Sequence, residues 1–311
     1  MKLIFFGTPE FALPTLKILL NSKHEVLAVV TQPDRQSGRG RRITSCPVKL
    51  EAQKAGLKVF QPLRVKDGEF IEELKKMNPS VAVVVAYGQI LPPEIIHLPE
   101  FGCINVHASL LPKYRGAAPI NWAVINGDKK TGVTTMLMDE GLDTGHVLIQ
   151  EVTEINAEDT AGDLSIKLSR IGADILTRTL ESMEKGDLKP VPQSGEATYA
   201  RLLKKSDGLI KWSKSSEELS NLIKGVNPWP GAYSFFEGEK IKILKAISVD
   251  GKMETGVVCK KTKNELIVGA GIGMLSILEV QPSGKPAMAI KSFLQGRKII
   301  EGSRFDENSV G

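Results

Sequence analysis

The first two hundred residues alternate short apolar runs with stretches whose apolar residues recur at helical spacing. Apolar runs predict strands at 2–6, 26–31, 81–86, 104–106, 133–138 and 147–154. Amphipathic stretches between these runs predict helices at 9–20, 47–55, 68–77 and 160–185. This rhythm is typical of a mostly parallel sheet covered by helices on both faces. We therefore predict a Rossmann-like α/β domain in the first part of the chain.

The pattern changes after residue 188. The next stretch carries Pro190, Pro192 and Gly195 without apolar periodicity, which is typical of a linker. Beyond it, a predicted helix at 215–224 precedes runs rich in β-formers at 231–236, 240–249, 256–260, 265–268 and 274–280. So many short strands favour a small OB-like β-barrel. We predict a Rossmann-like catalytic domain over 1–188, a linker over 189–206 and a C-terminal OB-like domain over 207–311.

Positive charge is concentrated in the last third of the chain. Residues 201–311 contain 18 Lys and Arg against 12 Asp and Glu, whereas residues 1–200 contain 23 against 24. This excess favours a polyanionic partner for the C-terminal domain, although a charged soluble surface would look the same. The longest apolar run, 81–87, is too short to cross a membrane. We expect a cytoplasmic monomer that makes no membrane contact.

Two familiar nucleotide-binding motifs are absent. Gly7-Thr8-Pro9 follows the first predicted strand, but it supplies one glycine where a dinucleotide fingerprint needs three. No P-loop pattern occurs either. The three cysteines, Cys46, Cys103 and Cys259, are dispersed and predict neither a disulfide framework nor a zinc site. Dehydrogenase and P-loop NTPase functions are therefore excluded, and we expect no metal.

The polar pair Asn105 and His107 lies at the end of a predicted buried strand. Residues two apart on a strand project from the same face. Ligands of open α/β sheets bind at the carboxyl ends of strands. A glycine-bracketed acidic loop at 139–145 carries a third candidate, Asp143. By spacing alone, a hydrogen-bonded polar pair explains Asn105 and His107 as well as a site does, and an ordinary acidic turn explains the loop better than a site does.

A longer combination of residues is far more specific. It consists of Asn105-x-His107, then Ser109-Leu110-Leu111-Pro112-x-Tyr114-Arg115-Gly116, then Gly141-Leu142-Asp143-Thr144-Gly145. This combination closely resembles the signature of the 10-formyltetrahydrofolate-dependent formyltransferases. Segments at 7–12, 31–35, 38–42, 227–232 and 281–285 extend the resemblance to the tRNA-directed members over nearly the whole chain. The resemblance implies a Rossmann-type catalytic domain, a C-terminal OB-like barrel, 10-formyltetrahydrofolate as formyl donor and methionyl initiator tRNA as acceptor.

The resemblance also implies roles for individual residues. Asn105 would donate a hydrogen bond to the formyl oxygen as that oxygen becomes anionic. His107 would manage the proton that the attacking amine loses, or stabilise the developing charge. Asp143 would orient His107, tune it, or accept the proton through water. The folate would contact the Ser109, Leu110, Leu111 and Pro112 turn, together with backbone near 87–91 and 137–142.

Four arginines follow the second predicted strand. They are Arg35, Arg39, Arg41 and Arg42. The resemblance implies that this segment contacts the tRNA acceptor stem, where guanidinium groups bind phosphates and stack on bases. A solvated flexible loop is the alternative. Other functions left open are formyl transfer to an amino-sugar nucleotide or purine precursor, hydrolysis of formyl-folate, and tRNA binding without catalysis.

Overall fold

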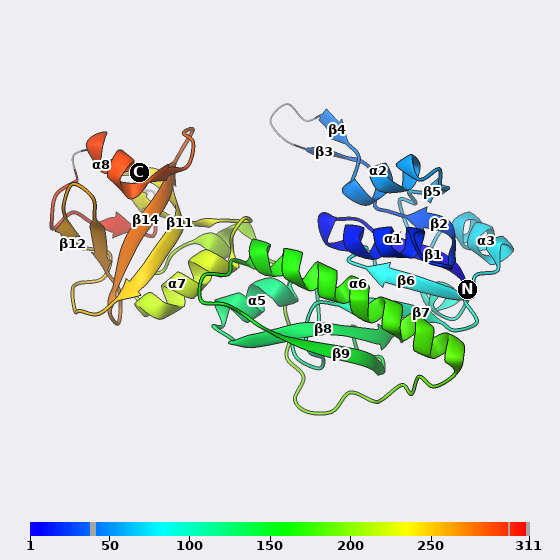
Figure 1. Cartoon of the computed structure of the whole chain (residues 1–311). Helices are drawn as coiled ribbons and strands as arrows, with labels where there is room; N and C mark the ends of the chain where they lie inside the picture. Colours follow the sequence, from blue (N-terminus) through cyan, green and yellow to red (C-terminus); the bar gives the residue numbers. More distant parts are fainter. Residues whose placement is uncertain (38–41, 298, 309–311) are drawn as a thin grey trace. The chain divides into compact units, whose positions relative to one another are not determined.

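The chain forms two compact units in a computed structural model, which describes residues 1–37, 42–297 and 299–308 (Figure 1). The first unit comprises Met1–Gly116, Lys130–Glu154 and Ser165–Ala200. The second comprises Ala117–Lys129, Ile155–Leu164 and Arg201–Gly311. Each unit therefore collects segments that are separate in the sequence. The division into domains over 1–188 and 207–311, with a linker over 189–206, stays a prediction.

A seven-stranded sheet forms the centre of the first unit, in the order β5-β2-β1-β6-β7-β8-β9. Its strands are β1 (Lys2–Gly7), β2 (Glu25–Val30), β5 (Val59–Phe60), β6 (Val81–Val85), β7 (Cys103–His107), β8 (Lys130–Leu137) and β9 (Val147–Glu154). The pairs from β5 to β7 are parallel, whereas β7–β8 and β8–β9 are antiparallel. The prediction of a mostly parallel Rossmann-like sheet is confirmed.

Helices cover both faces of this sheet. They are α1 (Leu13–Leu20), α2 (Pro47–Lys54), α3 (Gly68–Met77), α4 (Pro93–Ile96) and α6 (Ala161–Lys185), and a short 3-10 turn η1 (Glu10–Ala12) precedes α1. Residues of α3 and α4 form one core cluster with Ile4, Val84 and Cys103. On the opposite face α6 packs so closely on β7 that a Cβ at Gly172 would lie 2.8 Å from Val106. No helix among the described residues is long and apolar enough to cross a membrane.

Several short elements have no counterpart in the sequence prediction. The four-residue helix α4 and the two-residue strand β5 are too short to show a period. A hairpin of β3 (Arg35–Ser37) and β4 (Arg42–Thr44) follows β2, where the sequence favoured no regular structure. Helix α5 (Pro119–Ile125) belongs to the second unit although it precedes β8. Tertiary packing, rather than local pattern, therefore defines these elements.

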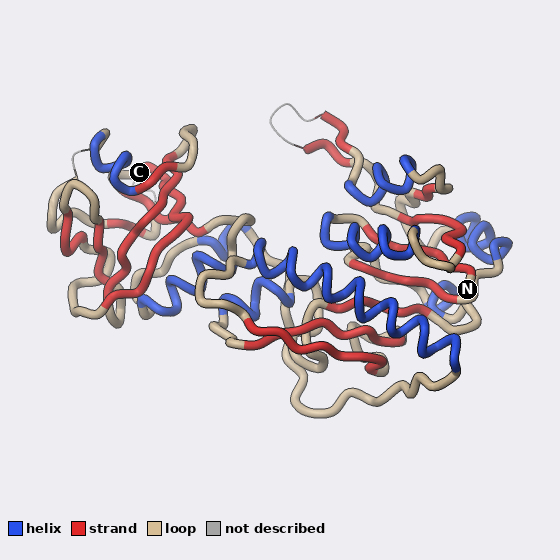
Figure 2. Tube along the Cα trace, viewed as in Figure 1, coloured by secondary structure: helices blue, strands red, loops and turns tan. Residues whose placement is uncertain are grey.

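The second unit is built on a curled antiparallel sheet with the order β12-β13-β14-β11-β10-β16 (Figure 2). Its strands are β10 (Ala232–Phe236), β11 (Glu239–Val249), β12 (Val258–Lys261), β13 (Leu266–Gly269), β14 (Met274–Pro282), β15 (Met288–Ala289) and β16 (Phe305–Asp306). Its further helices are η2 (Lys205–Gly208), α7 (Ser216–Gly225) and α8 (Ile290–Gln295). The five predicted strands are present, and the sheet forms the expected OB-like half-barrel.

Helix α7 packs against this sheet through Leu219 and Ile223, which are buried in the core of the second unit with Trp212. The helix begins at a capping box: Ser215 accepts a hydrogen bond from the backbone N–H of Glu218, and the Glu218 carboxylate accepts one from the backbone N–H of Ser215. These bonds satisfy two backbone donors that the first helical turn leaves free. They also hold the pKa of Glu218 below its usual range.

We expect Ser215→Ala to lower the free energy of unfolding of the second unit by about 1 kcal/mol, because the N-cap acceptor is lost. Urea titration followed by tryptophan fluorescence measures this change in one unit, since Trp122, Trp212 and Trp229 all belong to the second unit. The matched control is Ser213→Ala, an exposed serine outside the capping box, with an expected change below about 0.5 kcal/mol. Equal losses in both variants would contradict the capping contribution.

Candidate active site

Asn105 and His107 project from the face of β7 opposite to α6. Val106 between them points toward Gly172 of that helix, so alternation along the strand places both polar side chains on the other face. Cys103 on the same face is buried under α4, and its thiol lies 3.5 Å from the carbonyl of Ile95. The polar pair therefore emerges where the cover of α4 ends, as the strand-end argument predicted.

Asp143 reaches this pair from the loop between β8 and β9. Its Oδ1 accepts a hydrogen bond from Asn105 Nδ2 at 3.3 Å and lies 3.7 Å from His107 Nδ1. Its Oδ2 accepts a hydrogen bond from the backbone N–H of Gly116 at 2.8 Å. The side chains of His107 and Asp143 are only 6% and 13% exposed. The structure thus brings the three predicted side chains, Asn105, His107 and Asp143, together. We call them the trio. They are largely shielded from water, where electrostatic interactions are strong.

The backbone fixes which nitrogen of His107 carries hydrogen. His107 Nε2 lies 3.0 Å from the carbonyl oxygen of Tyr114, and a carbonyl oxygen only accepts. Nε2 is therefore the N–H donor, and Nδ1 of the neutral ring presents a lone pair toward Asp143. At 3.7 Å the Nδ1–Asp143 contact is longer than a hydrogen bond and becomes an ion pair when the imidazole is protonated.

Two residues that contact His107 have an unusual backbone conformation. Tyr114 has φ of 59° and Asp143 has φ of 53°, the left-handed region that side chains other than glycine avoid. Such residues cost about 1–3 kcal/mol each and persist only where surrounding contacts hold them. Tyr114 is held by its N–H, which donates to Oγ1 of Thr198 at 2.9 Å. Strain of this kind clusters at functional sites.

The Ser109–Pro112 turn is fastened by its own hydrogen bonds. Ser109 Oγ donates to the carbonyl of Lys113 at 2.5 Å, and Thr134 Oγ1 donates to the carbonyl of Ser109 at 2.6 Å. Ser109 and Leu111 are buried. Leu110 packs on Gly132, where a Cβ would lie 2.5 Å from a Leu110 methyl. The side chains of Ser109, Leu110 and Leu111 thus serve first to hold the turn beside the trio.

A buried tyrosine side chain lies at the end of β6, in the stretch 87–91 where the resemblance implied backbone contacts only. Tyr87 is 2% exposed, its carbonyl accepts a hydrogen bond from Thr8 Oγ1 at 2.9 Å, and its ring packs edge-on against Phe6. Its hydroxyl has no hydrogen-bond partner among the described residues. Burial raises the pKa of Tyr87, so the hydroxyl stays neutral and keeps a proton to donate. The apolar sequence around Tyr87 gave no signal that its hydroxyl would be buried without a partner.

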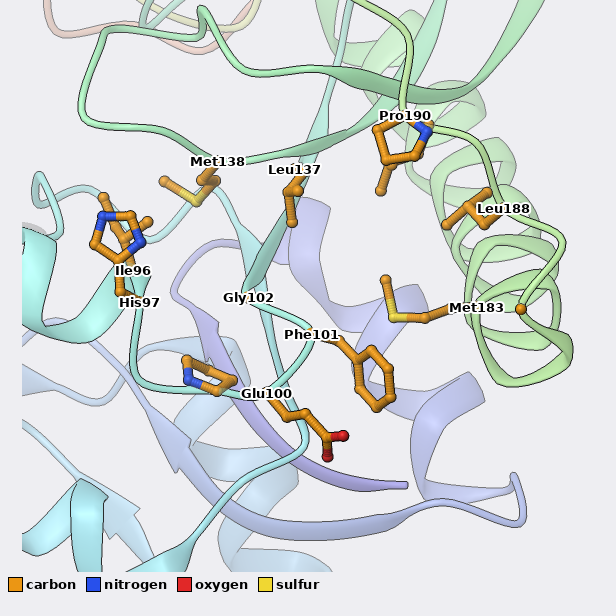
Figure 3. A pocket seen from close by; sticks show the side chains of 13 residues that line it. Ile96, His97, Glu100, Phe101, Gly102, Leu137, Met138, Met183, Leu188 and Pro190 are labelled. Atoms are coloured by element: carbon orange, nitrogen blue, oxygen red, sulfur yellow. The ribbon is translucent and has the colours of Figure 1, made fainter.

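An apolar hollow of about 550 Å³ lies next to the catalytic loop (Figure 3). Its lining includes Phe101, Leu137, Met138, Met183 and Pro190, and none of the trio belongs to it. Leu137 and Met138 lead directly into the loop that carries Asp143. The hollow therefore lies where β7 begins and β8 ends, away from the carboxyl end of β7 that carries His107. No group of three or more His, Cys, Asp or Glu within the described part of the chain could hold a metal ion.

The arrangement suits transfer of a group between two substrates. It offers an amide donor and an imidazole lone pair on a strand, and a carboxylate from a neighbouring loop, within one small volume. A donor aimed at developing negative charge and a base beside it are the parts that acyl-type transfer to a nucleophile requires. The fold and site together define a transferase.

Comparison with known proteins gives the family. The formyl transferase model matches residues 1–180, and the model of the formyl transferase C-terminal domain matches residues 202–298. The chain belongs to the formyl transferase family. A methionyl-tRNA formyltransferase of Thermodesulfovibrio yellowstonii is 54% identical over 96% of this chain and 97% of that protein. One of Pelotomaculum thermopropionicum is 50% identical over 97% of each chain.

Solved structures share the fold at low identity. A sugar 3N-formyl transferase crystallised with dTDP and 5-N-formyl-THF has a TM-score of 0.69 and 21% identity, covering 92% of this chain and 99% of its own. HypX from Aquifex aeolicus, in complex with tetrahydrofolic acid, has a TM-score of 0.62 and 16% identity, covering 97% of this chain and 50% of its own. These likenesses confirm the two-part fold that the sequence predicted.

Proposed function

We propose that this protein transfers the formyl group of 10-formyltetrahydrofolate to the α-amino group of methionyl initiator tRNA. The product would be N-formylmethionyl-tRNA for translation initiation. The carboxylate of Asp143 beside Asn105 and His107 of β7 carries this proposal. Full-length identity of about half to methionyl-tRNA formyltransferases supports it. Because charged tRNA is used by ribosomes, we place this activity in the cytoplasm, and we propose that the protein acts as a monomer.

The residues around the trio fit a folate as formyl donor. Only one N–H of the Asn105 amide is used within the described chain, and the other is free to bind an incoming oxygen. The hydroxyl of Tyr87, which has no partner among the described residues, offers a hydrogen bond to a polar ring edge. The carbonyls of the 109–112 turn already accept hydrogen bonds within the chain, so the turn contributes mainly shape. Leu110 and Pro112 are partly exposed and supply apolar contact. We assign folate binding to this region, with Ser109 and Leu111 shaping the turn.

The proton route follows from the hydrogen bonds of His107. Its Nε2 hydrogen is engaged by Tyr114, so Nδ1 is the atom that takes the proton from the attacking amine. Protonation turns the 3.7 Å contact with Asp143 into an ion pair, which stabilises the imidazolium. Asn105 donates to the formyl oxygen as negative charge develops there. When this intermediate collapses, the bond between the formyl carbon and N10 breaks, and the imidazolium gives its proton to N10, so that neutral tetrahydrofolate leaves. Asp143 thus acts through charge, while Asn105 and His107 touch the reacting atoms.

We expect Asn105→Ala, His107→Ala and Asp143→Ala each to lower kcat at least about 100-fold, the usual effect of removing such a group. Single-turnover formyl transfer with methionyl initiator tRNA measures the loss. His146→Ala is the matched control, because His146 is an exposed histidine in the same loop. Its rate should stay within about twofold of the wild type. Wild-type turnover in a folded variant of the trio would remove that residue from the mechanism.

The acceptor is tested directly by offering alternatives. Purified protein and 10-formyltetrahydrofolate are incubated with methionyl initiator tRNA, methionyl elongator tRNA, an amino-sugar nucleotide, or water alone. We expect rapid formyl transfer only to the initiator tRNA. Preferential formylation of the amino sugar, or hydrolysis at the same rate without acceptor, would refute the tRNA assignment while keeping the folate chemistry.

A basic and aromatic surface on the β10–β11 hairpin supports a nucleic-acid acceptor. Lys240 pairs with Phe235 across the hairpin and Lys242 with Tyr233, whereas Ser234 and Ile241 point into the core. Both lysines and both rings therefore share the outward face. Lysines bind phosphates and aromatic rings stack on bases. We propose that this face contacts the tRNA.

The lysines of this face lie close to further positive charge. Lys240 lies with Nζ 3.4 Å from the centre of the Tyr233 ring. Its pKa is lowered, first because the ammonium group loses water and then because Lys242 and Lys205 lie nearby. Within the described chain, none of the three lysines forms a salt bridge. A cluster of unpaired positive charge attracts a polyanion.

The arginine segment remains the second proposed tRNA contact. Arg35 is exposed, and its Nη2 donates to Oε1 of Gln32 at 3.1 Å. Arg39 and Arg41 lie outside the described residues. The backbone of Arg42 begins β4, but its side chain is likewise outside the description. The variant Arg41→Ala/Arg42→Ala should impair tRNA use and spare folate binding if the acceptor stem docks here.

We expect Lys240→Ala/Lys242→Ala to raise the KM for tRNA about tenfold and to flatten the dependence of log affinity on log salt by roughly 2, about one for each lost phosphate contact. The KM for the folate should not change. Lys252→Ala/Lys291→Ala removes the same charge from exposed positions of the same unit and controls for net charge. An identical change in both double variants would show that only overall charge counts.

A further inference from the structure

The segment that follows α6 runs beside the candidate site and is hydrogen-bonded to it. Val191 exchanges backbone hydrogen bonds of 2.8 and 2.9 Å with Val147 at the start of β9. Further along, the carbonyl of Thr198 accepts from the backbone N–H of Arg115 at 2.8 Å. Gln193 lies between these two attachments. Part of the predicted linker is thus threaded between the loop that carries Asp143 and the loop that follows β7.

The Gln193 amide uses all of its hydrogen-bonding capacity in this position. Its Nε2 donates to the carbonyls of Asp143 and Gly145, both at 2.8 Å. Its Oε1 accepts from Nε and Nη2 of Arg115 at 3.1 and 2.7 Å. Carbonyls only accept and a guanidinium only donates, so the orientation of the amide is fixed by its partners. No other amide side chain with four bonds of this kind occurs among the described residues.

The two loops that Gln193 joins are also the two that fix the Asp143 carboxylate. Gln193 holds the backbone carbonyl of Asp143 itself, in the left-handed conformation with φ of 53°. Through Arg115 it holds the residue before Gly116, whose N–H donates to Asp143 Oδ2 at 2.8 Å. The carboxylate is thereby fixed from its backbone and from its oxygen at once. Loss of the amide would release both attachments.

We infer that Gln193 is a positioning residue for formyl transfer, which keeps the Asp143 carboxylate aimed at His107 and Asn105. Gln193 touches none of these three side chains by hydrogen bond in the described structure, so it acts through the backbone of the 143–145 loop. A displacement of about 1 Å at a reacting group can cost about 100-fold in rate. The inference rests on the proposed formyl transfer for its rate measurement only.

The first test replaces Gln193 with methionine, which keeps the length of the side chain and removes all four hydrogen bonds. We expect kcat to fall about 10- to 100-fold, with the KM values for folate and tRNA within about twofold of the wild type. The matched control is Gln53→Met, an exposed glutamine of α2 in the same unit. Its kcat should equal that of the wild type. A Gln193→Met enzyme with wild-type kcat would overturn the inference.

Gln193→Glu adds a readout that a purely structural residue would not produce. An ionised glutamate still accepts from Arg115, but it places a negative oxygen against the carbonyls of Asp143 and Gly145. Protonation restores one donor. The rate of this variant relative to the wild type at the same pH should therefore rise as the pH falls. A ratio that is constant between pH 8 and pH 5.5 would contradict positioning by the donor side of the amide.

Hydrogen exchange separates this inference from the proposed function. The amide of Gly116 is protected by its bond to Asp143 Oδ2, so its exchange reports the position of the carboxylate without any substrate. We expect its exchange to accelerate at least about tenfold in Gln193→Met and to be unchanged in Gln53→Met. Unchanged exchange in Gln193→Met would overturn the inference. A wild-type protein that does not formylate methionyl-tRNA but shows the accelerated exchange in Gln193→Met would refute only the function.

Discussion

The site depends on a single carboxylate that three separate segments share. Asp143 receives hydrogen bonds from the side chain of Asn105 on β7 and the backbone of Gly116 in the next loop, and it faces His107. A carboxylate with two committed oxygens has little freedom to turn. Its own backbone is strained at φ of 53°, so the cost of that conformation must be offset by these bonds and by those on its carbonyl. The same hydrogen bonds therefore fix the position of the Asp143 carboxylate and the conformation of its loop.

Topology explains why this constraint needs so much support. Strand β8 is antiparallel to β7, and Leu137 at its end pairs with Ile104, toward the amino end of β7. The chain must turn back over the sheet for Asp143 to reach Asn105 and His107. It does so in a closed loop, in which Leu137 N–H donates to the carbonyl of His146 at 2.9 Å. Gly145 permits the tight closure, because a Cβ there would lie 1.8 Å from the Leu137 carbonyl oxygen.

Features that depend on local periodicity and strand direction were predicted from the sequence. Contacts made by loops and segments that turn back over the sheet were not. The apolar runs gave the main strands, and residue alternation correctly placed Asn105 and His107 on one face of β7. Spacing could not bring Asp143 to them, because its loop follows an antiparallel strand; the family resemblance did. Gln193 carries no charge and belongs to no periodic element, so the segment around Pro190 and Pro192 was interpreted as a linker.

The same limit applies to the basic surface. A count of lysines showed an excess, but only the register of β10 and β11 shows which lysines share a face with aromatic rings.

The hydrogen bond between His107 and the Tyr114 carbonyl narrows the three roles that sequence left open for Asp143. Because Nε2 already donates, the ring is oriented by Tyr114 and not by the carboxylate, whose distance of 3.7 Å from Nδ1 is too long for that task. Each oxygen of Asp143 has a second lone pair beside the bond from Asn105 or Gly116, so these bonds leave acceptance of a proton by Asp143 open. The other role is electrostatic: a fixed negative group 3.7 Å from Nδ1, largely shielded from water, would form an ion pair with a protonated ring. Such an effect falls with distance rather than vanishing when one bond breaks, which is why the position of the carboxylate, and hence of the loops that hold it, matters to the chemistry.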